Sequence, residues 1–299
     1  MQSHFGKGVI FAFCAAALNA TIGVLSKVLM NSGFSSSSIA LIKTLVGGLL
    51  LSGLLVFLKR PQHKARWRPA AVCAFLGIFM LFHFETLAYS HYAAAGVVVI
   101  LMASASIASI LLGRIVLKDP INANVTAGAG LTIAGIAVIF GADIQQGFTL
   151  QGAALASIGG CAYGAFSVAM KRMGVSGGLH FTRQLLMFGS LYLLLPAAGD
   201  GFTLGALTPV ALMALLALAT LPTILGFFCT TKAIEYLKPS QVQALELTEP
   251  LFAALLALVV LDEVPRDTLY LGGGLILLGL CFSNELLRSG RKAPHPSGV

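Results

Sequence analysis

The sequence predicts an all-α integral membrane protein with ten transmembrane helices, arranged as two five-helix repeats of inverted topology. Three observations lead to this prediction. Hydrophobic residues make up 57% of the 299 residues and charged residues only 10%, whereas a soluble domain carries about 25% charged residues. Ten apolar stretches approach the length of about 20 residues that crosses a bilayer. The two halves of the chain also match each other at an offset of 144 to 145 residues.

The low charge excludes several classes of protein. So few ionic groups cannot cover a globular surface, which argues against a soluble enzyme, a nucleic-acid-binding domain and a disordered protein. The net charge of +8 would suit a nucleic acid, but the basic residues lie beside the apolar stretches. We therefore expect the lipid bilayer as a partner and no nucleic acid.

The ten expected spans are residues 9–30, 38–58, 69–91, 94–117, 123–142, 150–170, 184–198, 207–234, 240–261 and 268–287. The seventh is short and the eighth is long, and we expect Pro196 and Pro222 to bend or end them. The remaining segments are too short to form an extramembrane domain. The function is therefore expected to lie within the membrane.

The lysines and arginines predict the orientation, because these residues are retained on the cytoplasmic side. If both termini are inside, the inner segments hold 14 of the 19 basic residues and the outer loops hold only Arg266. Four more lie within the spans. We therefore expect a multi-pass plasma membrane protein, in a bacterium an inner membrane protein, with cytoplasmic N- and C-termini.

The repeat defines the expected domains, residues 1–145 and 146–288, followed by a cytoplasmic tail at 289–299. The matching pairs are Lys27 and Lys171, Ala88 and Ala233, Val97 and Val242, Ala108 and Ala253, and Pro120 and Pro265. Five spans is an odd number, so the second copy starts on the opposite side of the membrane. Inverted repeats are typical of secondary transporters, whose site lies near the bilayer midplane between the halves.

The second half carries the more distinctive strings, at residues 233–237, 247–256 and 261–263, before a glycine-rich helix through Gly272 and Gly279. This pattern resembles the EamA-type domain of the drug/metabolite transporter superfamily. The first half resembles it less closely, with serine and alanine at 104–105 in place of Glu249 and Pro250. The resemblance implies ten helices, alternating access and export of small metabolites. The overall pattern is similar to that of the aromatic amino-acid exporters of the superfamily.

Polar and adaptable side chains at membrane depth are the candidate transport residues, because ionisable groups there usually face a cavity or a partner. Those expected to bind substrate are Asn19, His83, Met102, Ser106, Tyr163, Gln243 and Glu246. Asn19 and Tyr163 occupy equivalent positions in the two repeats. Met102 and Ser106 lie four residues apart, on one helix face.

Ion or proton coupling is assigned to His83, Glu246 and Glu249. The two glutamates are three residues apart and are expected to share a face of one continuous helix, where Pro250 frees a nearby carbonyl. The structural alternatives stay open: a helix cap or ion pair for Glu249, and a buried, hydrogen-bonded histidine for His83. The other ionisable residues in the spans, including Lys43, are expected to reach the lipid headgroups.

Six glycines are assigned to close helix packing: Gly128, Gly135, Gly160, Gly164, Gly272 and Gly279. The five cysteines all fall within predicted spans and lack a CxxC spacing, so we expect no metal site and no cofactor. No phosphate-loop string is present, so uphill transport needs an ion gradient or a partner.

Three functions remain in view. The leading one is a secondary carrier that exports small metabolites, above all aromatic or neutral amino acids, as its small-molecule substrate. The second is a multidrug or organic-cation exporter, which an acidic Glu246 would favour. The third, an integral-membrane enzyme, is disfavoured because the sequence has no HExxH or paired-histidine motif that would supply catalytic residues.

Overall fold

The fold is helical throughout the residues that the structure, a computed structural model, describes. These are residues 2–58, 67–119, 123–143, 149–199, 202–262, 264 and 267–283. No β-strand occurs among them. The prediction of an all-α protein is therefore confirmed, and the expected tail at 289–299 lies outside the described residues.

The first half of the chain holds α1 (Gln2–Asn19), α2 (Thr21–Asn31), α3 (Ser36–Phe57), α4 (Trp67–Ala74), α5 (Leu81–Tyr89), α6 (Ala94–Leu112) and α7 (Ala123–Asp143). The second half holds α8 (Leu150–Arg172), α9 (Leu179–Gly199), α10 (Pro209–Leu218), α11 (Phe227–Tyr236), α12 (Pro239–Glu246), α13 (Glu249–Leu261) and α14 (Asp267–Ser283). Three π-helical segments are η1 (Phe75–Met80), which joins α4 to α5, η2 (Gly113–Leu117), which extends α6, and η3 (Ala219–Gly226), which joins α10 to α11.

Each expected span coincides with one helix or with a run of consecutive helices. Within the described residues, seven of these runs are long and apolar enough to cross a membrane. Helix α9 starts earlier than expected and continues through Pro196, and Pro222 lies inside η3. The span of 28 residues at 209–236 accommodates this proline by widening to a π-helix rather than by ending.

Two expected spans are interrupted. Ala20 separates α1 from α2, and Leu247–Thr248 separate α12 from α13. Pro250 has no N–H to donate to the Glu246 carbonyl, which helps to end the helix there. The expectation that Glu246 and Glu249 share a face of one continuous helix is therefore wrong, because Glu246 ends α12 and Glu249 begins α13.

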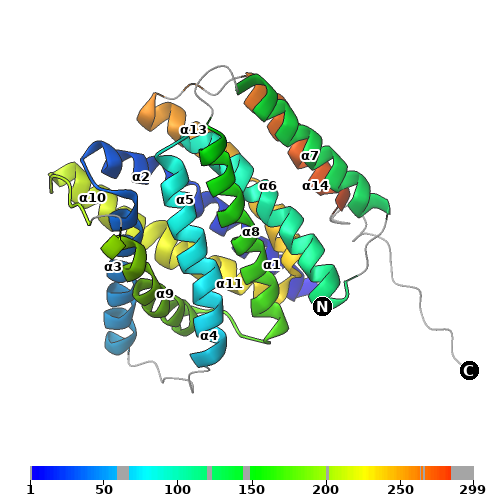
Figure 1. The fold of residues 1–299 in the computed structure, drawn as a ribbon. Coiled ribbons are helices and arrows are strands. Elements are labelled where there is room, and N and C mark those ends of the chain that lie inside the picture. The colour runs from blue at the N-terminus through cyan, green and yellow to red at the C-terminus, as the bar shows by residue number, and fades with distance from the viewer. Residues whose placement is uncertain are drawn as a thin grey trace, which may run out of the picture.

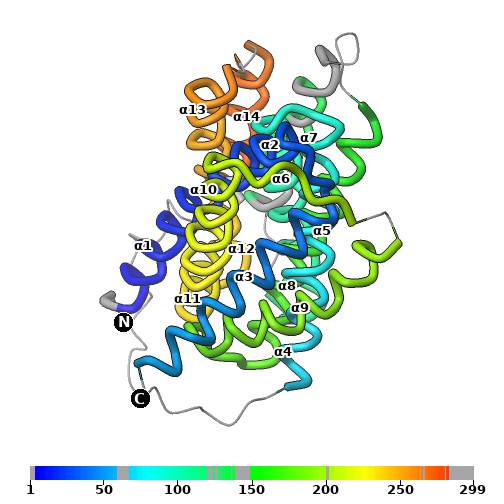
Figure 2. Tube along the Cα trace, turned by 90° about the vertical axis from the view of Figure 1, so that its left-hand side faces the viewer, coloured from blue at the N-terminus to red at the C-terminus, as the bar shows by residue number. Residues whose placement is uncertain are grey.

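The helices pack in pairs that repeat between the two halves. Helix α1 packs on α11. Helix α8 is the counterpart of α1 and α5 is the counterpart of α11, and these two helices also pack on each other. Helix α3 packs on α9, and α7 packs on α14, so these two pairs each join helices at equivalent places in the halves. Figures 1 and 2 show α7 and α14 side by side at one edge of the bundle.

Glycine backbones meet where α7 crosses α14. A Cβ atom added to Gly135 would collide with the Gly272 carbonyl oxygen, and one added to Gly279 would collide with the Gly128 carbonyl oxygen. The two contacts are equivalent, because each joins one glycine of the first repeat to one glycine of the second. Gly160 and Gly164 similarly bring α8 against the α6 carbonyls of Leu101 and Ala105. Only the absence of a side chain permits such close approach of helices.

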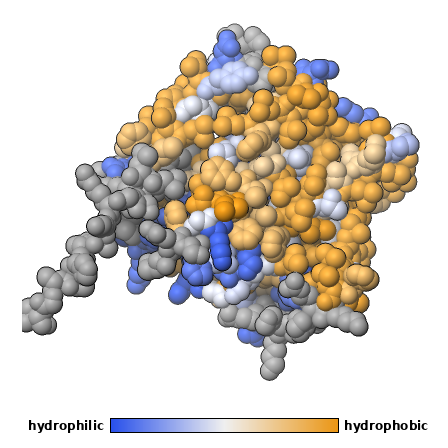
Figure 3. Space-filling model, turned by 180° about the vertical axis from the view of Figure 1, so that it is seen from behind, coloured by the Kyte–Doolittle hydropathy of each residue, from blue (hydrophilic) through white to orange (hydrophobic). Residues whose placement is uncertain are grey.

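The outer surface is strongly apolar. Large hydrophobic side chains are exposed along most helices, among them Leu49, Phe57, Leu195 and Val259. Figure 3 shows one face covered mainly by hydrophobic residues, with hydrophilic residues toward its edges. A soluble monomer rarely exposes an apolar surface of this extent, so the surface matches a lipid environment.

The α7–α14 crossing is testable with leucine substitutions. Gly135→Leu places a side chain against the Gly272 backbone, and such overpacking costs about 1–3 kcal/mol. We expect a lower midpoint of thermal unfolding in detergent. Gly130→Leu is the matched control, because nothing lies within 4 Å of a Cβ at that position of α7. Equal effects of the two substitutions would contradict the crossing described above.

Candidate functional site

Four ionisable side chains lie deep inside the helical bundle. The exposed fraction is 0% for Lys43, 2% for Glu85, 0% for Glu246 and 3% for Glu249. Electrostatic interactions link Lys43 to Glu85, Glu85 to Glu249, and Glu249 to Glu246. Charges this deep in a membrane protein are costly unless they pair with one another or with a ligand. This run of residues is therefore the candidate site.

The Glu246 cluster consists of Glu246, Tyr163, Thr230, Gln243 and Ser167. The Tyr163 hydroxyl donates to Glu246 Oε2 at 2.7 Å, and the Thr230 hydroxyl donates to Oε1 at 2.9 Å. Gln243 Nε2 donates to Ser167 Oγ at 3.0 Å, and Gln243 Oε1 has no hydrogen-bond partner among the described residues. The cluster thus joins α8, α11 and α12 through a single carboxylate.

Asn19 approaches the same region from the end of α1. Its Oδ1 lies against the Cα of Gly226, one turn before Thr230, and has no hydrogen-bond partner in the described part of the chain. Asn19 and Tyr163, at equivalent positions in the two repeats, therefore both contact the η3–α11 segment. The structure brings four of the predicted residues together here: Asn19, Tyr163, Gln243 and Glu246.

The Lys43 cluster consists of Lys43, Phe82, Glu85 and Tyr89. The Tyr89 hydroxyl donates to Glu85 Oε1 at 3.1 Å. Lys43 Nζ lies 3.9 Å from the centroid of the Phe82 ring, a cation–π contact. Neither Lys43 Nζ nor Glu85 Oε2 has a hydrogen-bond partner among the described residues. This cluster comes from α3 and α5, both in the first half of the chain.

Aromatic rings lie between the two clusters. Phe82 and Phe227 meet edge to face, with ring centroids 5.2 Å apart. They are 145 residues apart and so occupy equivalent positions. Phe227 also contacts Tyr163 and Phe166, with centroids at 6.4 and 6.0 Å. This contact between rings at equivalent positions of the two repeats therefore lies between Lys43 and the Glu246 cluster.

The other predicted residues lie outside these clusters. His83 is half-buried and stacks on Phe79 at 6.0 Å, in an aromatic group that includes Tyr192. Met102 and Ser106 are buried in α6, which packs against α8 and α12. Glu249 stands in the first turn of α13, where the helix dipole favours a carboxylate.

Sequence reasoning misplaced Lys43 and missed Thr230. Lys43 does not extend to the headgroups, because its side chain is fully buried against Phe82. Thr230 carries no charge, so its burial in an apolar span costs little free energy. A threonine there does not stand out in the sequence. Its position 145 residues after Glu85 is the signal that could have found it, since it stands where the first repeat has a buried carboxylate.

A polar cavity opens at one end of the bundle. Its volume is about 410 Å³, and it is lined by Lys27, Met30, Asn31, Phe34, Ser35, Ser36, Tyr89 and Ser90. One of its lining residues, Tyr89, is buried and hydrogen-bonded to Glu85. We call this cavity the vestibule, because Tyr89 connects it to the Lys43 cluster.

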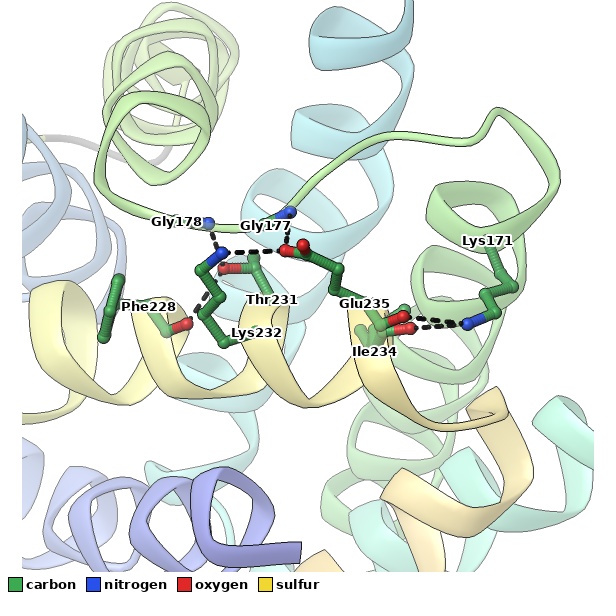
Figure 4. A network of polar contacts seen from close by, with 8 residues as sticks. All are labelled: Lys171, Gly177, Gly178, Phe228, Thr231, Lys232, Ile234 and Glu235. Atoms are coloured by element: carbon green, nitrogen blue, oxygen red, sulfur yellow. Dashed lines mark hydrogen bonds and ion pairs between the residues drawn. The ribbon is translucent and has the colours of Figure 1, made fainter. Parts of the chain in front are cut away.

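A polar network, which we call the clasp, lies toward the opposite end of the bundle (Figure 4). Lys232 Nζ and the Gly177 N–H both reach Glu235 Oε2, at 2.9 and 3.0 Å. The Gly178 N–H donates to Thr231 Oγ1 at 3.2 Å. Lys171 Nζ donates to the carbonyls of Ile234, Glu235 and Leu237. The loop after α8 is thereby held against α11.

The vestibule and the clasp occupy equivalent places in the two repeats. Lys27 of the vestibule matches Lys171 of the clasp. Ser90, however, stands where the clasp has Glu235, and Leu87 stands where it has Lys232. The end that lacks this ion pair holds the open cavity.

The comparison with family models decides the identity. A model of the EamA-like transporter family matches residues 6–141 and again residues 150–284. The chain belongs to the EamA-like transporter family. It is thus a multi-pass membrane protein of the drug/metabolite transporter superfamily, and the family points to a transporter of a small molecule rather than an enzyme.

Two relatives from Bacillus subtilis (strain 168) support membership of the EamA-like family. The uncharacterized transporter YdfC is 23% identical over 256 residues, which cover 84% of this chain and 82% of the relative. The uncharacterized transporter YwfM is 23% identical over 274 residues, or 91% of each chain. A solved crystal structure also superposes with a TM-score of 0.68 at 20% identity, covering 95% of this chain and 98% of the other, which shows a shared fold.

The hydrogen bonds to Glu246 can be tested within this EamA-like fold. Tyr163→Phe removes one donor from a buried carboxylate, which costs about 1–3 kcal/mol. We expect a lower unfolding midpoint in detergent. Tyr192→Phe is the control, because Tyr192 contacts Phe75 and Phe79 through its ring, which this substitution keeps. A Tyr163→Phe protein as stable as this control would argue against the bond.

Proposed function

We propose that the protein is a secondary exporter of small amphipathic metabolites, above all aromatic or other neutral amino acids. The observation that carries the proposal is the pair of buried polar clusters on either side of the Phe82–Phe227 contact. Polar groups would hold the substrate's head group, and the aromatic rings would accommodate an apolar side chain. Membership of the EamA-like family supports transport as the activity.

The proposed mechanism is alternating access between two inverted five-helix repeats, residues 1–145 and 146–288. The paired packing of α1 on α11 and of α8 on α5 supports this division. So do Lys118 and Asp262, which are 144 residues apart and both have left-handed backbones, with φ of 59° and 53°. The two matches of the family model fall within the same limits. In such carriers one repeat rocks against the other around a central site.

The distribution of basic residues supports a cytoplasmic location for both termini. Under this orientation the clasp is on the cytoplasmic side, since His4 near the start of α1 contacts the ring of Tyr236. The vestibule then faces outward. A salt bridge of 3.6 Å between Lys238 and Asp119 also joins the two repeats on the clasped side.

Glu246 is the proposed coupling residue. It accepts two hydroxyl hydrogen bonds, and no basic side chain among the described residues forms an ion pair with it. A buried carboxylate without a cation is suited to exchange a proton during the cycle. Glu249 interacts electrostatically with both Glu85 and Glu246 and would transmit the charge state between the clusters. His83 is a weaker proposal, because it stacks in the separate aromatic group.

An organic-cation exporter is the second candidate. The specific observation in its favour is that, among the described residues, three carboxylates but only one lysine are buried. Competition by cationic dyes, with no effect of amino acids, would select this function.

Transport in proteoliposomes tests the leading proposal. Protein-loaded vesicles should show saturable counterflow of aromatic amino acids, and an imposed pH gradient should drive their accumulation. Glu246→Gln should abolish the accumulation and retain the counterflow, because the exchangeable proton is lost. Asp267→Asn, at the exposed start of α14, should leave both unchanged. Equal leakage with and without protein would refute the proposed function.

Cysteine labelling tests the proposed orientation. In a background with the five native cysteines replaced by alanine, Ser90→Cys in the vestibule should react with a membrane-impermeant maleimide in intact cells. Ser176→Cys, in the exposed loop beside the clasp, should react only after the membrane is opened. Reaction of Ser176→Cys in intact cells would reverse the orientation.

A further inference from the structure

Lys43 and Glu85 form an incomplete pair of opposite charges. The exposed fractions of their side chains are 0% and 2%. They are close enough to interact electrostatically, but no direct ion pair joins them among the salt bridges of the described residues. Lys43 Nζ and Glu85 Oε2 are both without hydrogen-bond partners in the same part of the chain. Buried charges left this way carry a large desolvation cost.

The surrounding protein satisfies only half of this pair. The Tyr89 hydroxyl donates to one carboxylate oxygen of Glu85, and the other oxygen has no hydrogen-bond partner among the described residues. Phe82 offers Lys43 the face of its ring, but an ammonium group has three N–H donors and a ring face replaces none of its hydrogen bonds. Two groups are therefore left without hydrogen bonds among the described residues. They are the Lys43 ammonium, which donates, and Glu85 Oε2, which accepts, and they are close enough to interact electrostatically.

We propose that Lys43 and Glu85 bind the head group of a zwitterion, the adjacent carboxylate and ammonium of an amino acid. The Lys43 ammonium donates to the substrate carboxylate, and the substrate ammonium donates to Glu85 Oε2. Phe82 then contacts the apolar part of the substrate. This inference rests on the proposed transport function and names the residues that select its substrate.

The chemistry of the pair favours a zwitterion over the simpler charges. An organic cation would satisfy Glu85 and leave Lys43 unpartnered, and an anion would do the reverse. Each such omission leaves a buried charged group without a hydrogen bond, which is unfavourable. A zwitterion satisfies both and adds no net charge to a site that already contains three carboxylates.

The site lies next to the vestibule. Tyr89 lines the vestibule, and its hydroxyl donates to Glu85 Oε1. In the second repeat the places equivalent to Lys43 and Glu85 hold uncharged residues, Met187 or Phe188 and Thr230. The second repeat therefore has no lysine–glutamate pair at the equivalent place.

The test compares three ligands on purified protein: phenylalanine, its methyl ester, which lacks the carboxylate, and 3-phenylpropanoate, which lacks the ammonium. Wild type should bind phenylalanine at least about tenfold more tightly than either analogue. Lys43→Met should weaken phenylalanine binding by about 10- to 100-fold and change ester binding little. Glu85→Gln should weaken binding of phenylalanine and the ester, and spare 3-phenylpropanoate.

Lys7→Met, at an exposed position of α1, is the control for loss of a lysine and should bind all three ligands like wild type. Retained binding of the methyl ester by Lys43→Met also demonstrates that this variant is folded. If either variant fails to fold, the wild-type preference for phenylalanine over both analogues still decides. Equal binding of phenylalanine and its ester by wild type would overturn the inference.

The two proposals fail differently. If wild type transports phenylalanine and Lys43→Met binds it equally well, the head-group site is wrong and the transport function stands. If wild-type vesicles move no amino acid and cationic dyes compete for binding, the proposed substrate class fails, and the zwitterion site fails with it.

Discussion

The hydrocarbon interior of a bilayer offers no hydrogen bonds, so every polar group at that depth needs a partner within the protein or its ligand. This constraint explains why the charged side chains gather inside the bundle while leucine, valine and phenylalanine cover its outside. Glu246 meets the constraint with two hydroxyl donors, and Glu85 meets half of it with Tyr89. Lys43 has no hydrogen-bond partner among the described residues and lies against the Phe82 ring. Lys43 is thus the buried charged group with the fewest hydrogen bonds from the protein, and it would gain most from hydrogen bonds to a substrate.

The two halves share their backbone arrangement and differ in their chemistry. Phe82 and Phe227 are the same residue at equivalent places, and they contact each other. Around them the side chains diverge: Glu85 corresponds to Thr230, Ser90 to Glu235 and Leu87 to Lys232. These replacements put a lysine–glutamate site on one side of the rings, a hydroxyl-bound glutamate on the other, and an ion-paired clasp at only one end. Two halves with similar helix packing thus form a molecule whose two ends differ in their polar side chains.

The apolar stretches of the sequence were sufficient to predict the helices, and the repeat offset identified glycines such as Gly135 and Gly279 that lie where α7 crosses α14. The sequence did not predict the break at Leu247–Thr248, because proline is tolerated both within a helix and at its start. Pro196 lies within α9, and Pro250 lies at the start of α13. Lys43 was misjudged for a related reason. Its distance along the helix from the membrane surface is visible in the sequence, but the direction of its long side chain depends on packing against α5.

The position of the π-helical segments connects the site to the proposed movement. Segment η1 ends at Met80, two residues before Phe82, and η3 ends at Gly226, directly before Phe227. Both rings therefore follow a stretch of irregular helix, and such stretches are frequent at functional sites. A substrate held by Lys43 and Glu85 lies against Phe82, so its binding would act on the contact between the repeats. Separation of the two rings would then join the vestibule side to the Glu246 cluster, and this would couple substrate binding to the rocking of one repeat against the other.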